Sequence, residues 1–131
     1  MAVMATDAPR PTATELDILR ILWDRGPSTV REVHEVIGKD RKIGYTGVLK
    51  FLQIMTVKGS VVRNESQRAH VYEPSEPAAV TKRRVAADML RRVFGGSASD
   101  LVQCLLDDDK VPPAEIALIR GLLDTRQMPT R

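Results

Sequence analysis

The chain has 131 residues, of which 43% are hydrophobic and only 4% aromatic, enough for one small domain with an aliphatic core. Its single cysteine, Cys104, excludes an internal disulfide, and the lack of any run of about 18 apolar residues argues against a transmembrane helix. The formal net charge is only +3, and the first residues contain no apolar stretch, so we expect no secretory signal and a cytoplasmic protein.

The charge is distributed unevenly along the chain. Between Lys39 and His70, seven cations and two anions give a local net charge of +5. Between Leu105 and Asp124, five anions and two cations give a local net charge of −3. Clustered cations are expected where a protein faces phosphate, so the first stretch is the candidate for contact with nucleic acid.

Residues 1–11 are small, polar and rich in turn formers, and we interpret them as a flexible arm. A helix is predicted to begin after Thr12, because Thr12 and Glu15 have the spacing of a capping box. Gly26-Pro27 ends this helix, and Ser28 is predicted to cap a second one that ends at Gly38. Two helices joined by a short turn that contains glycine are typical of a helix-turn-helix.

A third helix is predicted from Tyr45 to Lys58, with Gly59 ending it. At about 100° per residue, Val48, Phe51, Leu52 and Met55 share one side of the helix, and Thr46, Lys50 and Gln53 share the other. Two short alternating runs follow at residues 61–63 and 69–72, with a polar connection at 64–68, and predict a β-hairpin. Three helices followed by a hairpin indicate a winged helix-turn-helix domain at residues 12–75.

Pro74 and Pro77 mark a boundary, after which we expect a helical region at residues 76–126 and a flexible tail at 127–131. Three short amphipathic helices are predicted there, so the fold class is mostly α. Such helices need tertiary packing, and we expect them to pack against a second copy of the chain as a homodimer. The residues assigned to this dimerisation are Ala86, Met89, Leu90, Val93, Phe94, Leu101, Leu105, Ile116, Ile119, Leu122 and Leu123.

The third helix has the two faces that a reader of the DNA major groove needs. We assign base readout to Thr46, Lys50 and Gln53, because Gln can pair with adenine and Lys can reach guanine. Contacts to the DNA backbone are assigned to Ser28, Thr29, Lys42, Tyr45, Lys58, Arg63 and Arg68. For Arg68, near the tip of the hairpin, entry into a minor groove is the alternative to a phosphate contact.

No residues assemble a reactive centre, so we expect no enzyme, no catalytic residues, no metal site and no cofactor. His34, His70 and Cys104 are scattered, and Asp107-Asp108-Asp109 lies in a turn between helices. The first hypothesis is a sequence-specific DNA-binding transcriptional repressor that acts as a homodimer on a dyad-symmetric operator. The alternative is a winged-helix protein-interaction module without DNA affinity, which the weak net charge and Gly47 keep open.

Over about residues 12–124, the chain resembles the penicillinase-repressor family (the BlaI/MecI/CopY group). The resemblance is carried by Thr12-x-x-Glu15, Leu22-Trp23, Ser28–Val33, Tyr45–Leu52, Lys58-Gly59, Tyr72-x-Pro74 and Glu115–Leu123. It implies a homodimer held by the C-terminal helices, a double-stranded DNA operator, and in some members a membrane sensor protease as a further partner. The bond that is cleaved in those members, Asn-Phe, would fall at Cys104-Leu105, where the residues differ, and Gly47 replaces the usual Thr.

Overall fold

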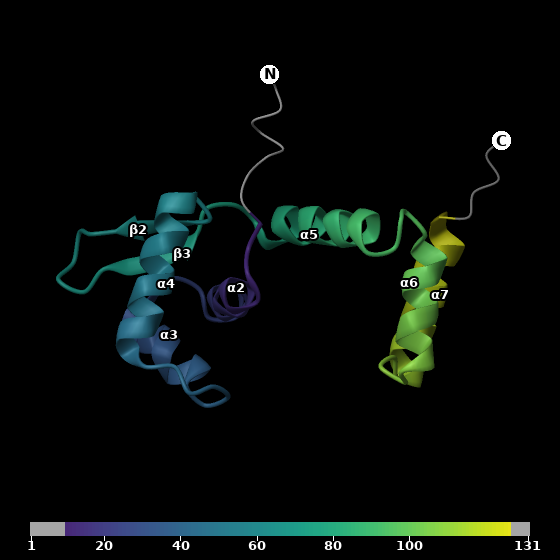
Figure 1. Ribbon diagram of the computed structural model, residues 1–131, viewed down its shortest axis with the longest axis horizontal. Helices are drawn as coiled ribbons and strands as arrows, with labels where there is room; N and C mark the ends of the chain where they lie inside the picture. The colour runs from purple at the N-terminus through teal and green to yellow at the C-terminus, as the bar shows by residue number, and fades with distance from the viewer. Residues whose placement is uncertain (1–9, 127–131) are drawn as a thin grey trace, which may run out of the picture. The chain divides into compact units, whose positions relative to one another are not determined.

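The computed structural model describes residues 10–126 (Figure 1). Of the predicted N-terminal arm, residues 1–9 lie outside the described residues, and so does the predicted tail at 127–131. The described chain is mostly helical, which confirms the predicted fold class. Its elements are α2 Ala13–Arg25, β1 Ser28–Thr29, α3 Val30–Ile37, α4 Tyr45–Lys58, β2 Val61–Asn64, β3 Val71–Pro74, α5 Ala78–Arg92, α6 Ala98–Asp107 and α7 Pro113–Arg126.

The predicted start and end of α2 are confirmed. Thr12 is the N-cap: its hydroxyl oxygen accepts from the Glu15 backbone N–H at 3.2 Å, and Glu15 Oε1 accepts from the Thr12 N–H at 3.2 Å. At the other end, Gly26 has a φ of 92°, a conformation that favours glycine, and its N–H binds the Leu22 carbonyl. The capping box therefore fixes the first turn of α2.

The prediction that Ser28 caps the next helix is wrong. Ser28 and Thr29 form β1, and Thr29 is the N-cap of α3, with a capping box to Glu32. Ser28 is fully buried, donates its hydroxyl proton to the Gly26 carbonyl at 2.8 Å and accepts from Arg25 Nε at 3.3 Å. Because Ser28 pairs with Tyr72 of β3, its backbone belongs to the sheet rather than to the helix end.

The three strands form one antiparallel sheet in the order β1-β3-β2. The hairpin of β2 and β3, called the wing below, pairs Arg63 with Tyr72 and Asn64 with Val71. The predicted second strand began at Ala69, but β3 begins at Val71 and extends to Pro74. Asn64 joins β2, so the connection covers residues 65–70 instead of the predicted 64–68.

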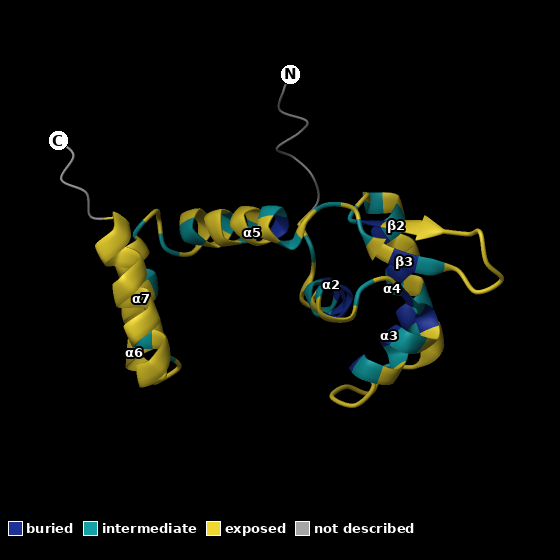
Figure 2. Ribbon diagram, turned by 180° about the vertical axis from the view of Figure 1, so that it is seen from behind, coloured by how far each residue is buried: buried dark blue, intermediate teal, exposed yellow. Residues whose placement is uncertain are grey.

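The core lies where α2, α3, α4 and the sheet meet, as the dark ribbon in Figure 2 shows. It is almost entirely aliphatic, as expected from the composition, and Tyr72 is its one fully buried aromatic residue in the described part of the chain. The first turns of α5 belong to the same compact part of the chain as this core. Thr81 is buried and donates to Glu76, and Lys82 Nζ lies 5.4 Å from the centre of the Trp23 ring.

The chain divides into two compact units within α5, between Val85 and Ala86. In the second unit, Ser97 is the N-cap of α6, and α7 begins at Pro113. Neither α6 nor α7 has a buried residue. Among the described residues, no helix has the length and apolar content to cross a bilayer.

Candidate nucleic-acid interface

Helix α4 has the bounds predicted from the sequence, Tyr45–Lys58, and the predicted division into two faces. Val48, Leu52 and Met55 are completely buried in the core. On the opposite side, Thr46, Lys50 and Gln53 are all exposed. We call these three residues the polar row. The buried face anchors the helix, and the polar row is free to meet a ligand.

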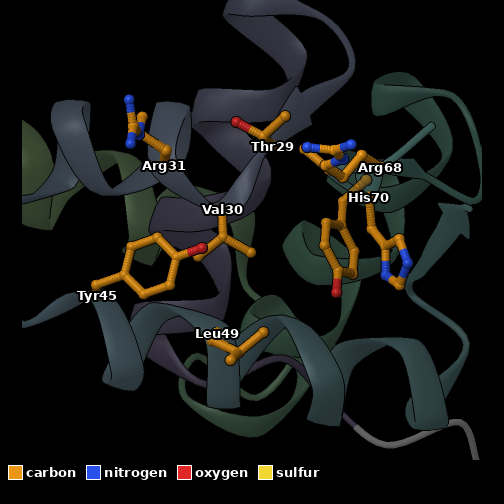
Figure 3. Close-up of a pocket in the computed structure, with 9 residues that line it drawn as sticks. Thr29, Val30, Arg31, Tyr45, Leu49, Arg68 and His70 are labelled. Atoms are coloured by element: carbon orange, nitrogen blue, oxygen red, sulfur yellow. The ribbon is translucent and has the colours of Figure 1, made fainter.

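Beside α4 lies a hollow of about 490 Å³, walled by the start of α3, by α4 and by the wing (Figure 3). Tyr45 and Leu49 line it from α4. Figure 3 shows Arg31 on one side of the hollow and Arg68 and His70 on the other. We call it the wing hollow; its lining is completed by Thr29, Val30, Ala69 and Tyr72.

The wing hollow has an excess of positive charge. Arg31 and Arg68 are both exposed, and in the described part of the chain neither forms an ion pair. No carboxylate lines the hollow. Tyr45, which is half exposed, has its ring held edge-on to His34, with the ring centres 6.2 Å apart. Such a concave, cationic surface with a phenol and a threonine suits an anion such as a phosphate.

Three of the seven residues predicted to contact the DNA backbone meet in this hollow: Thr29, Tyr45 and Arg68. Sequence reasoning missed Arg31 and His70, which lie there as well. For Arg31 a signal was present, since it is a cation two residues after Thr29, in the first turn of α3. For His70 the signal was weak, because the residue was placed in a strand.

Two other predicted residues have structural partners. Ser28 is buried and bonded as described above, which removes its side chain from the proposed phosphate contacts. Lys58 Nζ lies 2.8 Å from Glu15 Oε1, and the Glu15 side chain is only 4% exposed. A buried carboxylate needs a counter-charge, so the structure gives Lys58 a role inside the domain.

Arg63 and Lys42 remain at the surface. Arg63 lies on β2, and its Nε donates to Glu65 Oε2 at 2.7 Å. A side-chain hydrogen bond with Tyr72, and then one with Glu65, raise the pKa of Arg63 above its ordinary value. Glu65 compensates part of the charge of the Arg63 guanidinium. Lys42 is exposed in the segment before α4.

The comparisons with known proteins identify the family of this chain. The family model for the penicillinase repressor matches residues 11–125. The chain belongs to the penicillinase repressor family. Membership confirms the resemblance drawn from the motifs between Thr12 and Leu123.

Individual members of the penicillinase repressor family match over shorter stretches. Two Mycobacterium tuberculosis proteins, from strains CDC 1551 / Oshkosh and ATCC 25618 / H37Rv, both named transcriptional regulator BlaI, are 39% identical over 61 residues. The match covers 46% of this chain and 44% of each relative, so it spans less than half the length of these curated proteins. The fold is also similar to a solution structure of the monomeric form of Bacillus licheniformis BlaI in complex with the blaP half-operator. There the identity is 19% and the TM-score 0.49, over 56% of this chain and 89% of the other.

Proposed function

We propose that this chain is a sequence-specific DNA-binding transcriptional repressor that acts as a homodimer on a dyad-symmetric operator. The observation that carries the proposal is the placement of the polar row on α4 directly beside the cationic wing hollow. The name of the Mycobacterium tuberculosis relatives, transcriptional regulator BlaI, supports the same function.

In this proposal α4 enters the major groove, which admits one helix and presents a different pattern of donors and acceptors for each base pair. Thr46, Lys50 and Gln53 then face base edges. The wing hollow receives the DNA backbone, where Arg31 and Arg68 neutralise phosphates and Thr29 and Tyr45 supply hydroxyl groups. Phosphate contacts set the position of the protein on the duplex, and the polar row reads the sequence.

The homodimer is proposed because α6 and α7 leave their apolar residues exposed. Leu105, Ile119, Leu122 and Leu123 are exposed, and Leu101 and Ile116 are only half-buried. Pairing with a second copy would remove this surface from water. A dimer would bind a dyad-symmetric operator, with each copy on one half-site. Its place of action is the cytoplasm.

A sensor protease is the further partner that the family suggests for the release of repression. Cys104 and Leu105 lie inside α6, so cleavage between them requires that this helix first unfolds locally. The proposal therefore predicts slow cleavage of folded protein at this bond.

The test of the function is selection of an operator from a random duplex pool, followed by titration of the selected and of a scrambled duplex at several salt concentrations. We expect tight, salt-dependent binding that prefers the selected duplex. Lys50→Ala should remove about 1–3 kcal/mol of that preference, the value of one good base contact. Flat titrations with every duplex would contradict the proposal and favour the protein-interaction module.

A further inference from the structure

Helix α4 carries apolar side chains on its exposed side that neither the core nor the polar row uses. In the described chain up to Val85, the exposed large hydrophobic residues are Tyr45, Ile54, Val57 and Val62. Ile54 and Val57 both belong to α4, Tyr45 already lines the wing hollow, and α2 and α3 contribute none. Single apolar residues scattered over a surface need no explanation, but Ile54 and Val57 are three residues apart on one helix and form a small apolar patch.

Ile54 and Val57 are the pair of interest, because they lie next to the polar row. Ile54 is 40% exposed and Val57 is 88% exposed. Ile54 follows Lys50 by one turn, Val57 follows Gln53 by one turn, and residues so spaced are neighbours on a helix surface. The pair therefore extends the polar row toward the C-terminal end of α4.

The core does not account for these two side chains. Leu49 and Phe51, on the same helix, pack against the core cluster, but Ile54 and Val57 do not belong to it. Burial of an isoleucine or valine side chain is favourable, and the folded chain alone does not obtain this free energy from Val57. Val57 is therefore available to a surface from outside the winged-helix unit.

We propose that Ile54 and Val57 contact the C5-methyl groups of thymines in the operator and so determine part of its sequence. Thymine is the base that presents an apolar group at its major-groove edge. This inference rests on the proposed function, because it needs α4 to lie in that groove. It adds a requirement for thymine at particular positions of each half-site to the hydrogen-bond readout by the polar row.

The dimensions of α4 fit this assignment. At about 1.5 Å per residue, Thr46 and Val57 are separated by about 16 Å along the helix axis. At about 3.4 Å per base pair, this distance corresponds to roughly five base pairs. The thymines read by Ile54 and Val57 should therefore lie in the same half-site as the bases read by the polar row, displaced toward one side of it.

The experiment removes one methyl group at a time from the DNA. The full chain is titrated by fluorescence anisotropy with its selected operator, in which each thymine of one half-site is replaced in turn by deoxyuridine. We expect about a fourfold loss of affinity at one or two positions, the equivalent of roughly 0.8 kcal/mol for one buried methyl group. In Ile54→Ala or Val57→Ala, affinity for the unmodified operator should fall, and the deoxyuridine at that position should cause no further loss.

Val62→Ala is the matched control, because Val62 is exposed on β2 rather than on α4. This variant should retain the full penalty for deoxyuridine. The salt dependence of binding should be the same in all variants, which shows that the phosphate contacts are intact.

The inference is overturned if no thymine is sensitive to the loss of its methyl group. It is also overturned if both α4 variants keep the full deoxyuridine penalty, since the methyl group is then recognised by other residues or through DNA shape. Either result leaves the proposed function standing as long as the selected operator is preferred. Absence of any preference in the wild-type chain would refute the proposed function, and this inference with it.

Discussion

The carboxylate of Glu15 shows what one buried charge requires of its neighbours. Its Oε1 accepts from the Thr12 backbone N–H and lies 2.8 Å from Lys58 Nζ, whose side chain is 23% exposed. Removal of one partner of a buried pair leaves an uncompensated charge and costs about 3–5 kcal/mol. Because Lys58 is partly exposed, we expect Lys58→Met to lower the free energy of unfolding by an amount near the bottom of that range, measured by urea denaturation.

The control for this prediction is the double variant Glu15→Gln/Lys58→Met. A glutamine oxygen can still accept from the Thr12 N–H, and no charge remains buried, so most of the lost stability should return. Lys50→Ala, at an exposed position, should change stability very little. Equal stability of the Lys58 and Lys50 variants would show that the ion pair contributes nothing.

Replacement of Gly47 by alanine has two opposing effects on stability. Alanine raises helix propensity by about 1 kcal/mol relative to glycine. However, a Cβ at this position would lie 3.1 Å from Ile43 Cγ1, which is tighter than ordinary contact. Since Ile43 lies at the edge of the core, we expect Gly47→Ala to stabilise the fold by clearly less than the propensity gain. Thermal unfolding of Gly47→Ala with and without Ile43→Ala, which removes Cγ1, measures the difference, and net destabilisation of Gly47→Ala would show that Ile43 cannot move.

Arg68 and Arg63 differ in what balances their charge. Arg68 is in the wing hollow without a carboxylate, whereas Arg63 is bound to Glu65. Each phosphate contact contributes about one unit to the salt dependence of binding. We therefore expect Arg68→Ala to weaken binding to selected and scrambled duplexes alike and to reduce the salt slope by about one. Arg63→Ala should reduce both the affinity and the salt slope by a smaller amount. If Arg63→Ala has the larger effect of the two variants, the DNA backbone runs along β2.

At the scale of elements, the start of α3 depends on Thr29. Its hydroxyl oxygen accepts from the Glu32 N–H at 3.2 Å, and Glu32 Oε1 accepts from the Thr29 N–H at 2.9 Å. Loss of an N-cap costs about 0.5–2 kcal/mol, so Thr29→Ala should destabilise the fold by that amount and Thr29→Ser should not. Chemical denaturation compares the two variants. A similar loss in both would point to strand β1 and not to the cap.

The helices could be predicted well because their signals are local. The capping box at Thr12, the apolar repeat of α4 and the glycine at position 59, which has a φ of 86°, all lie within the elements that they define. Strand β1 could not be predicted in this way. It has two residues, too few for an alternating pattern, and it exists only because Ser28 and Thr29 pair with Tyr72 and Val71, far away in the sequence.

The same distinction applies to the candidate site. The exposure of Thr46, Lys50 and Gln53 follows from helix periodicity, which the sequence displays. The partnership of Lys58 with Glu15 joins α4 to α2 and depends on how these helices pack. From the sequence alone, Lys58 is therefore interpreted as a surface cation that contacts the DNA backbone. The wing hollow is formed by residues of three separate segments of the chain. Its lining residues, including Arg31 and His70, could therefore be identified only from the folded structure.

At the scale of the whole molecule, the two units differ in how they hide apolar surface. In the first, α2, α3, α4 and the sheet enclose a core with several fully buried residues. In the second, α6 and α7 bury none, although their sequences are rich in leucine and isoleucine. The first unit therefore has the core of an independent domain. The second unit calls for a partner, and we propose a second copy of itself.

Leu122→Glu tests this proposal, because Leu122 is exposed on α7 and a carboxylate there would be buried at a dimer contact without a partner. We expect the variant to be monomeric in analytical ultracentrifugation, to keep its affinity for a half-site, and to lose most of the advantage of the full operator. That advantage depends on half-sites about 34–36 Å apart, so insertion of half a helical turn between them should weaken wild-type binding in the same way.

Ala117→Glu is the matched control: it adds the same charge about 140° away around the same helix, and it should leave both the dimer and the operator affinity intact. If Leu122→Glu stays dimeric, the two copies associate through another surface.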